Sequence, residues 1–360
     1  MTKDKIAPTQ FLTLVFVSRM MVSLTHIPTL NHQEVKTDLL FSIAMSLPVI
    51  LLFFIPAYLF EKKFGHMTIL EVFQAKSKAA SYTVSGFYLI WFLFVCMLNM
   101  ARFVYFATSE LSPDIAGIMF VILICIAGAY GAYMGIQSLV RVSSVAMVFM
   151  ALSFLAIIAM SVQYFKMLNF SPLLDNYFSD NVANAFSVAC NATDISTLFF
   201  VLPSINGKIR NKFISVLTII TVTVFSLYFT VIGVTGEYAQ TQAFPIFALS
   251  QITGFGVVER LDAIFTGVWI VSLVLKSGLY LYVANICLEH FLKKKKRPVT
   301  IGVCTLIVGV GALVCSGSFM HYIKSSNNII NIITFSVFVI VIPVITLFLK
   351  KPKEIGAESA

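Results

Sequence analysis

Ten long apolar stretches, separated by short polar segments, limit the folds that this chain can adopt. They lie at residues 8–30, 38–60, 82–108, 114–134, 142–163, 183–204, 213–234, 257–284, 299–317 and 329–349. A helix of about 20 apolar residues crosses the roughly 30 Å hydrocarbon core of a bilayer. Only 11% of the residues are charged, whereas soluble domains carry about 25%. The runs are continuous rather than alternating, which argues against a β-barrel. The sequence therefore predicts an all-α integral membrane protein with ten transmembrane helices.

The lysines and arginines cluster in alternate gaps between these stretches. If the N-terminus lies inside the cell, 18 of the 25 fall on the cytoplasmic side. Cytoplasmic loops are enriched in basic residues, so both termini are predicted to be cytoplasmic. The run Lys293–Arg297 is interpreted as part of this orientation signal, because it lacks the aromatic platform of a nucleic-acid site. We therefore expect the lipid bilayer, and no nucleic acid, as a partner.

Residues suited to metal binding or catalysis do not gather anywhere in the sequence. The six cysteines have no CxxC spacing, and the five histidines are scattered. There is neither a phosphate loop nor a spaced nucleophile and base. The sequence predicts no enzyme activity, no metal site and no cofactor.

Ten spans divide into two sets of five, residues 1–163 and 164–349, followed by a cytoplasmic tail at 350–360. Because five is odd, the second set begins on the opposite side of the membrane from the first. In transporters with such inverted repeats, the first helix of each half is often broken near the bilayer midplane and binds substrate there. The sequence predicts a 5+5 inverted repeat with spans 1 and 6 discontinuous.

Polar residues interrupt the middle of the sixth stretch. They are Cys190, Asn191, Thr193, Asp194, Ser196 and Thr197. Such residues cost free energy in hydrocarbon unless they are paired or face a cavity. Two interpretations remain open, a set of interhelical hydrogen bonds or an unwound segment that lines a pocket. We favour the pocket, with a predicted lining of Cys190, Asn191, Thr193 and Asp194.

The first stretch gives a weaker signal for a break. No glycine marks one, but Ser23, Thr25 and Pro28 allow it in the outer half. Ser23 and Thr25 are therefore predicted to line the ligand pocket. Arg19 lies in the same stretch, where its charge must pair or reach water.

Two segments between the spans are predicted to form short helices. Residues 61–81 mix apolar and charged residues in the pattern of an amphipathic helix. Residues 235–256 hold Pro245 and an apolar run, and we expect them to dip back as a capping helix over an outward vestibule.

The eighth stretch carries the most informative charges. Glu259 and Asp262 lie at its start, where acidic residues complement the helix dipole. Asp262, Trp269 and Lys276 lie on one helical stripe. Lys276 is deep enough that an unpaired ammonium would cost several kcal/mol. It is interpreted as a fixed cation in place of a sodium ion, as a carrier of a coupling proton, or as a structural partner of a helix C-terminus or a carboxylate such as Asp194.

The start of this stretch also carries a family resemblance. It resembles the hallmark of the B subunits of bacterial spore germinant receptors, here formed by Pro245, Glu259, Arg260, Asp262 and Trp269. The length, the ten spans and the basic tail agree, so the resemblance covers the whole chain.

This resemblance implies a LeuT-like fold of the amino acid–polyamine–organocation superfamily, in the inner membrane of a spore-forming bacterium. It implies a small nutrient ligand, such as an amino acid, and receptor A and C subunits as partners. Many relatives carry glycines in the middle of span 1, where this chain has Met20, Met21, Val22 and Ser23. This difference narrows the expected pocket or changes its ligand.

Three functions remain as hypotheses. The first, which we favour, is a transporter-like sensor that binds a nutrient germinant and signals to partner subunits. The second is a proton- or sodium-coupled amino-acid symporter, and the third is a scaffold whose polar residues serve only packing. Trp269 completes the predicted ligand-binding set, and Lys276 with Asp194 forms the predicted ion- or proton-coupling pair.

Overall fold

The predicted apolar stretches form a helical bundle. The computed structural model describes residues 5–24, 35–111, 116–172, 177–253, 262–292, 296–325 and 328–351. Within these ranges it is helical, with one isolated β-bridge between Ile6 and Ile205. Eight helices are long and apolar enough to cross a membrane, and two shorter apolar helices are Pro8–Leu24 and Ile332–Leu347. Each of the ten predicted stretches contains helix, so the predicted all-α membrane fold is confirmed.

The continuous long helices are α2 (Thr37–Phe64), α4 (Lys78–Phe106), α5 (Gly117–Met134), α6 (Ile136–Ser161), α9 (Arg210–Thr235), α12 (Asp262–Leu292) and α13 (Arg297–Ser325). The first span is α1 (Pro8–Leu24), and the last combines α14 (Asn328–Ser336), a π-helical segment and α15 (Ile342–Leu347). Helices α12 and α13 end at residues 292 and 325, beyond the predicted ends at 284 and 317. Backbone hydrogen bonding continues past an apolar run, so hydropathy does not locate the end of a helix.

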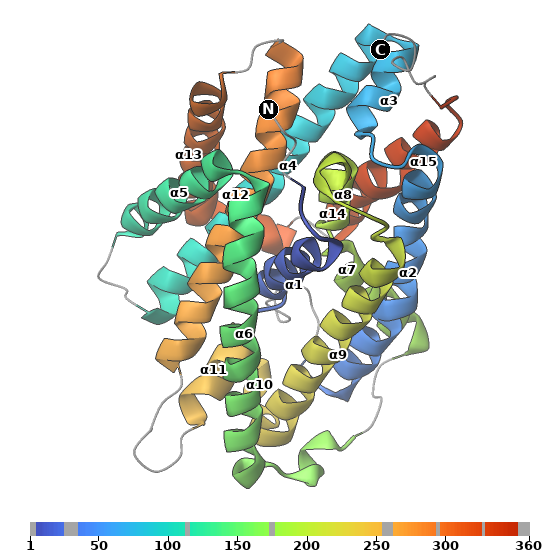
Figure 1. Ribbon diagram of the computed structural model, residues 1–360. Coiled ribbons are helices and arrows are strands. Elements are labelled where there is room, and N and C mark those ends of the chain that lie inside the picture. Colours follow the sequence, from blue (N-terminus) through green and yellow to red (C-terminus); the bar gives the residue numbers. More distant parts are fainter. Residues whose placement is uncertain are drawn as a thin grey trace.

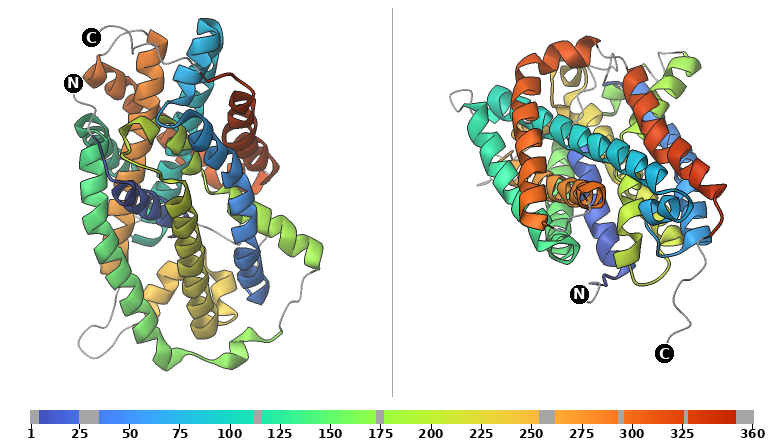
Figure 2. Two further views of the ribbon diagram at one scale, coloured as in Figure 1. Left: turned by 45° about the vertical axis from the view of Figure 1, so that its right-hand side comes forward. Right: turned by 90° about the horizontal axis from the view of Figure 1, so that it is seen from above.

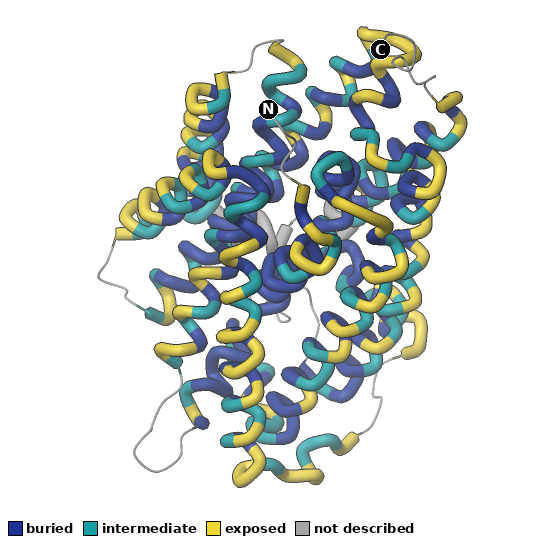
Figure 3. The backbone as a smooth tube through the Cα atoms, viewed as in Figure 1, coloured by how far each residue is buried: buried dark blue, intermediate teal, exposed yellow. Residues whose placement is uncertain are grey.

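Helix α12 lies at the centre of the bundle and packs against α1, α4, α5, α6 and α13 (Figures 1 and 2). Helices α5, α6 and α13 present many exposed apolar side chains, as expected for surfaces in contact with lipid. Burial is greatest around α1 and the sixth span (Figure 3). The most polar of the predicted spans is therefore also the one most enclosed by other helices.

Several polar contacts join helix termini that carry basic residues. The Glu61 carboxylate at the end of α2 accepts hydrogen bonds from the backbone N–H groups of Ile209 and Arg210, both at 2.8 Å. Lys63 donates to the carbonyl of Leu347 at 2.6 Å. Arg297 donates to the carbonyl of Ala132 at 3.0 Å. These contacts join the end of α2 to the start of α9 and the end of α15, and the end of α5 to the start of α13.

Both predicted short helices are present. Residues 61–81 contain α3 (Ile69–Lys76), which begins with a capping box between Thr68 and Glu71. Residues 235–256 contain α11 (Pro245–Ile252), with Pro245 in its first turn. These two helices lie at opposite ends of the molecule (Figure 1).

We predict that Glu61→Gln lowers the free energy of unfolding by about 1–3 kcal/mol, because the buried N–H groups at the start of α9 lose one charged acceptor. The measurement is equilibrium unfolding of the purified protein in detergent. Glu237→Gln, at an exposed position, is the matched control and should have little effect. Equal stability of the two variants would contradict the proposed cap.

Candidate ligand site and ion pair at the broken span

The sixth span is broken, as the sequence predicts. Helix α7 (Phe178–Cys190) ends before residues 191–194, and α8 (Ile195–Val201) begins after them. Side chains here bond to the local backbone, since Thr197 donates to the carbonyl of Asp194 at 2.7 Å and Ser196 to that of Thr193 at 2.6 Å. The same two carbonyl oxygens also accept the backbone N–H groups of Ser196 and Thr197, both at 3.1 Å, so the side-chain hydroxyls add a second hydrogen bond to each carbonyl of the break.

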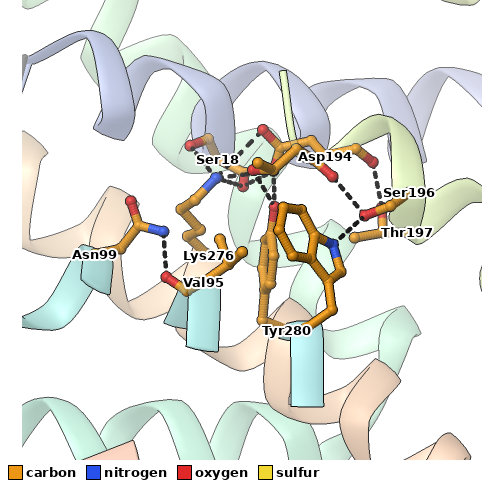
Figure 4. Close-up of polar contacts among 10 residues, drawn as sticks. Ser18, Val95, Asn99, Asp194, Ser196, Thr197, Lys276 and Tyr280 are labelled. Carbon is orange, nitrogen blue, oxygen red and sulfur yellow. Dashed lines mark hydrogen bonds and ion pairs between the residues drawn. The ribbon is translucent and has the colours of Figure 1, made fainter. Parts of the chain in front are cut away.

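Asp194 forms a buried ion pair with Lys276 of α12. The Lys276 ammonium lies 3.0 Å and 3.2 Å from the two carboxylate oxygens (Figure 4). The side chains of Lys276 and Asp194 are 1% and 3% exposed. The carboxylate partner that was one of the interpretations of Lys276 is therefore present, and the pair joins the broken span to the central helix.

Other oxygens complete the surroundings of this ion pair. Ser18 of α1 donates to Asp194 Oδ1 at 2.5 Å, and its hydroxyl and carbonyl oxygens both accept from Lys276 at 3.3 Å. The Tyr280 hydroxyl lies 3.4 Å from Asp194 Oδ1 and 2.7 Å from the Thr193 hydroxyl. The Lys276 ammonium also lies 4.9 Å from the centre of the Tyr280 ring. The buried Lys276 ammonium is therefore held by four oxygens, two from Ser18 and two from Asp194.

Two small cavities lie beside the break. The first, of about 30 Å³, is lined by Arg19, Val22, Ser23, Leu39, Ile43, Val188, Asn191, Val224 and Tyr228. The second, of about 40 Å³, is lined by Val22, Trp91, Phe94, Val95, Leu98, Asn99, Arg102, Cys190, Asn191, Thr193 and Thr334. Val22 and Asn191 line both and so form the wall between them. Each cavity holds only a few water-sized groups.

The structure brings most of the predicted ligand-binding residues to this region. Ser23 lines the first cavity, Cys190 and Thr193 line the second, and Asn191 lines both. Asp194 lies next to them in the ion pair. The predicted ligand residue Thr25 and the motif residues Glu259 and Arg260 lie outside the described residues.

Trp269 lies elsewhere, in an aromatic cluster between α4, α11 and α12. Its ring centre is 3.7 Å from that of Phe106, 5.7 Å from that of Phe244 and 5.8 Å from that of Phe265. Phe244 precedes the motif residue Pro245, and Asp262 begins α12 one turn before Phe265. Trp269 lines neither cavity. The motif residues Pro245 and Trp269 thus belong to the packing that fixes α11 against α12.

Sequence reasoning gave no role to several residues of the site. Tyr280 lies four positions after Lys276, so helical spacing alone places it on the same face. Ser18 precedes Arg19, the only charged residue of the first span, but a lone serine carries no signal in an apolar run. Trp91, which donates to Ser196 at 3.4 Å, and Tyr228 depend on tertiary packing.

Comparison with known proteins gives a family and a fold. The sequence matches the model of a family described as spore germination protein over residues 5–319. No curated protein matches the sequence. Among solved structures, a Na⁺-coupled sialic acid symporter in a substrate-bound outward-open state matches with a TM-score of 0.62 at 10% sequence identity. The match covers 96% of this chain and 90% of the symporter chain. The fold is therefore LeuT-like.

We predict that Lys276→Met leaves the protein inserted but lowers the free energy of unfolding by about 3–5 kcal/mol, because the Asp194 carboxylate stays buried without its cation. Adding Asp194→Asn should recover a large part of the loss, since neither charge then remains. Equilibrium unfolding in detergent measures both variants, with Lys208→Met at an exposed position as control. A single variant as stable as the parent chain would show that the ion pair is not needed for folding.

Proposed function

The chain belongs to the spore germination protein family and has the fold of a membrane transporter, and we propose its function from these two findings. Together they make it a transporter-like germination protein. We infer that it is the nutrient-sensing membrane subunit of a spore germinant receptor. In this role a small molecule, such as an amino acid, binds in the core and triggers germination.

The break in the sixth span, with a cavity on each side of Asn191, is the observation that carries this proposal. The side chains of Asn191 and Thr193 lie where five other helices, α1, α2, α4, α9 and α14, line the two cavities. Both cavities are smaller than an amino acid, so in our proposal the ligand binds only after the site has opened. A ligand that binds a more open state shifts the population towards it, and in our proposal partner subunits respond to that shift.

The Lys276 ammonium supports a sensor over an ion-coupled transporter. The ammonium is part of the Lys276 side chain, and it hydrogen-bonds to the oxygens of Ser18 and Asp194 at 3.0–3.3 Å. A tethered cation cannot enter from one side of the membrane and leave on the other. We propose that it stabilises the broken span in place of an exchangeable sodium ion.

A proton- or sodium-coupled amino-acid symporter is the second candidate. The similarity of the fold to that of a Na⁺-coupled symporter favours it. In that case Lys276 and Asp194 would carry the coupling proton between them. The two candidates share the ligand site and differ in whether the ligand crosses the membrane.

The sensor proposal includes the cellular setting. We place the chain in the inner membrane of a spore-forming bacterium, with both termini in the cytoplasm and with receptor A and C subunits as partners. Residues 1–163 and 164–349 are proposed to be the inverted halves. Trp269 then acts on ligand binding through the aromatic cluster that positions α11.

We predict that Asn191→Ala weakens the germination response at least tenfold, because Asn191 contributes to both cavities. The chain and its neighbouring subunit genes are expressed in spores that lack other receptors. The germinant is first identified by screening amino acids, sugars and nucleosides. Asn206→Ala, at an exposed position beyond α8, is the control and should respond normally. An unchanged response of Asn191→Ala at normal protein level would remove the pocket from the proposal.

We predict little concentrative uptake of that germinant, in radiolabelled form, by proteoliposomes containing the chain, with either an inward sodium or an inward proton gradient. The tethered ammonium occupies the place of an exchangeable sodium ion, and in our proposal the ligand is sensed rather than carried across the membrane, so neither gradient should drive uptake. In spores, Lys276→Met should insert but fail to signal. Robust uptake that stops when the sodium gradient or the proton gradient is dissipated would instead establish the symporter.

A further inference from the structure

Arg19 is a buried cation with most of its hydrogen-bonding capacity unused. It lies on α1 and is 5% exposed. Among the described residues its guanidinium makes one hydrogen bond, from Nη2 to the carbonyl of Val188 at 3.1 Å, and its Nη1 has no partner. A guanidinium carries five N–H donors, and an uncompensated charge inside a membrane protein costs several kcal/mol. Such a group calls for an anionic partner.

The nearby carboxylate does not fill this role. Asp194 forms its ion pair with Lys276 and accepts a further hydrogen bond from Ser18. Within the part of the chain that the structure describes, no carboxylate lies within 4.0 Å of the Arg19 guanidinium. The anion that would complete Arg19 must therefore come from outside this set.

A second unpartnered polar group faces the same cavity. Tyr228 of α9 is 1% exposed, lines the 30 Å³ cavity together with Arg19, and has no hydrogen-bond partner for its hydroxyl among the described residues. Ser23 and Asn191 add a hydroxyl and an amide to the lining. Buried polar groups are normally satisfied by protein, water or ligand. Two orphaned groups around one cavity indicate an occupant.

The chemistry of the lining selects that occupant. Arg19 and Tyr228 both offer hydrogen-bond donors, and the guanidinium matches the planar, two-oxygen geometry of a carboxylate. The remaining walls are the aliphatic side chains of Val22, Leu39, Ile43, Val188 and Val224. We infer that this cavity is a subsite for the carboxylate of a small aliphatic acid, held by Arg19 and Tyr228. This inference rests on the proposed function only in taking that carboxylate as part of the germinant.

The size of the cavity fits one end of such a ligand. A volume of about 30 Å³ accommodates a carboxylate-sized group but not a whole amino acid. The rest of the ligand would extend past Val22 and Asn191 into the second cavity, which shares these two residues. The Asn191 side chain is held there by a long hydrogen bond to the carbonyl of Ser187, at 3.4 Å. In our proposal Asn191 gives up this long hydrogen bond and moves aside when the ligand binds.

Formate is the direct probe, because it is the smallest carboxylate. The full chain in lipid nanodiscs is titrated with formate at constant ionic strength, and the unfolding temperature is recorded. We expect a saturable rise for formate and none for formamide, its neutral analogue. Arg19→Gln should abolish the rise, and Tyr228→Phe should weaken formate binding about tenfold while preserving the packing of the ring.

Tyr88→Phe is the matched control, since it removes a buried hydroxyl that bonds to the carbonyl of Phe338 and lies outside both cavities. This variant should bind formate like the parent chain. An equal response to formamide, no response of the parent chain, or an undiminished response of both Arg19→Gln and Tyr228→Phe would overturn the carboxylate subsite. The Tyr228→Phe result remains decisive if Arg19→Gln fails to fold.

The spore assay separates this inference from the proposed function. Germination by neutral sugars or nucleosides alone, unchanged in Tyr228→Phe, would leave the sensor in place and refute the carboxylate as part of the germinant. Conversely, formate binding with the expected variant pattern in a chain whose spores respond to no nutrient would support the subsite while the sensor function fails.

Discussion

The ion pair between Lys276 and Asp194 is the interaction on which the core of the bundle depends. A helix broken inside a membrane exposes backbone groups that lipid cannot satisfy. Here the break is enclosed by other helices, and its one carboxylate is neutralised by an ammonium fixed on the central helix. Ser18 and Tyr280 share that carboxylate, so α1, the sixth span and α12 meet at a single charged centre. Removing either charge alone would leave the other buried without a partner, at a cost of several kcal/mol.

Much of the fold could be predicted because it follows from the thickness and the apolar interior of the lipid bilayer. The length of apolar runs gives the spans, and charge placement shows which helix ends lie together, as the contacts of Glu61 and Lys63 show. The break at residues 191–194 was also predictable, because polar residues that bond to their own backbone weaken a helix. In each case the signal is local in the sequence.

The parts of the site that escaped prediction depend on contacts between distant segments. Ser18 and Lys276 are 258 positions apart, and neither apolar run reveals which face turns inward. Trp269 shares a helical stripe with Lys276, yet it lies in an aromatic cluster away from both cavities, because the stripe passes from one neighbouring helix to another along α12. Spacing along one helix fixes a face, whereas the partner of that face is set by tertiary packing.

Two consecutive residues of α1 hold the two sides of the break. Arg19 donates to the Val188 carbonyl near the end of α7, and Ser18 donates to Asp194 at the start of α8. The described residues around the break thus include two buried cations, Arg19 and Lys276, with one carboxylate between them. An anionic group bound to Arg19 would balance the excess positive charge. It would also contact the turn of α1 whose Ser18 hydrogen-bonds to the ion pair. Ligand binding and the position of α12 would then be coupled through α1, since a ligand can shift a conformational equilibrium only by binding its two states differently.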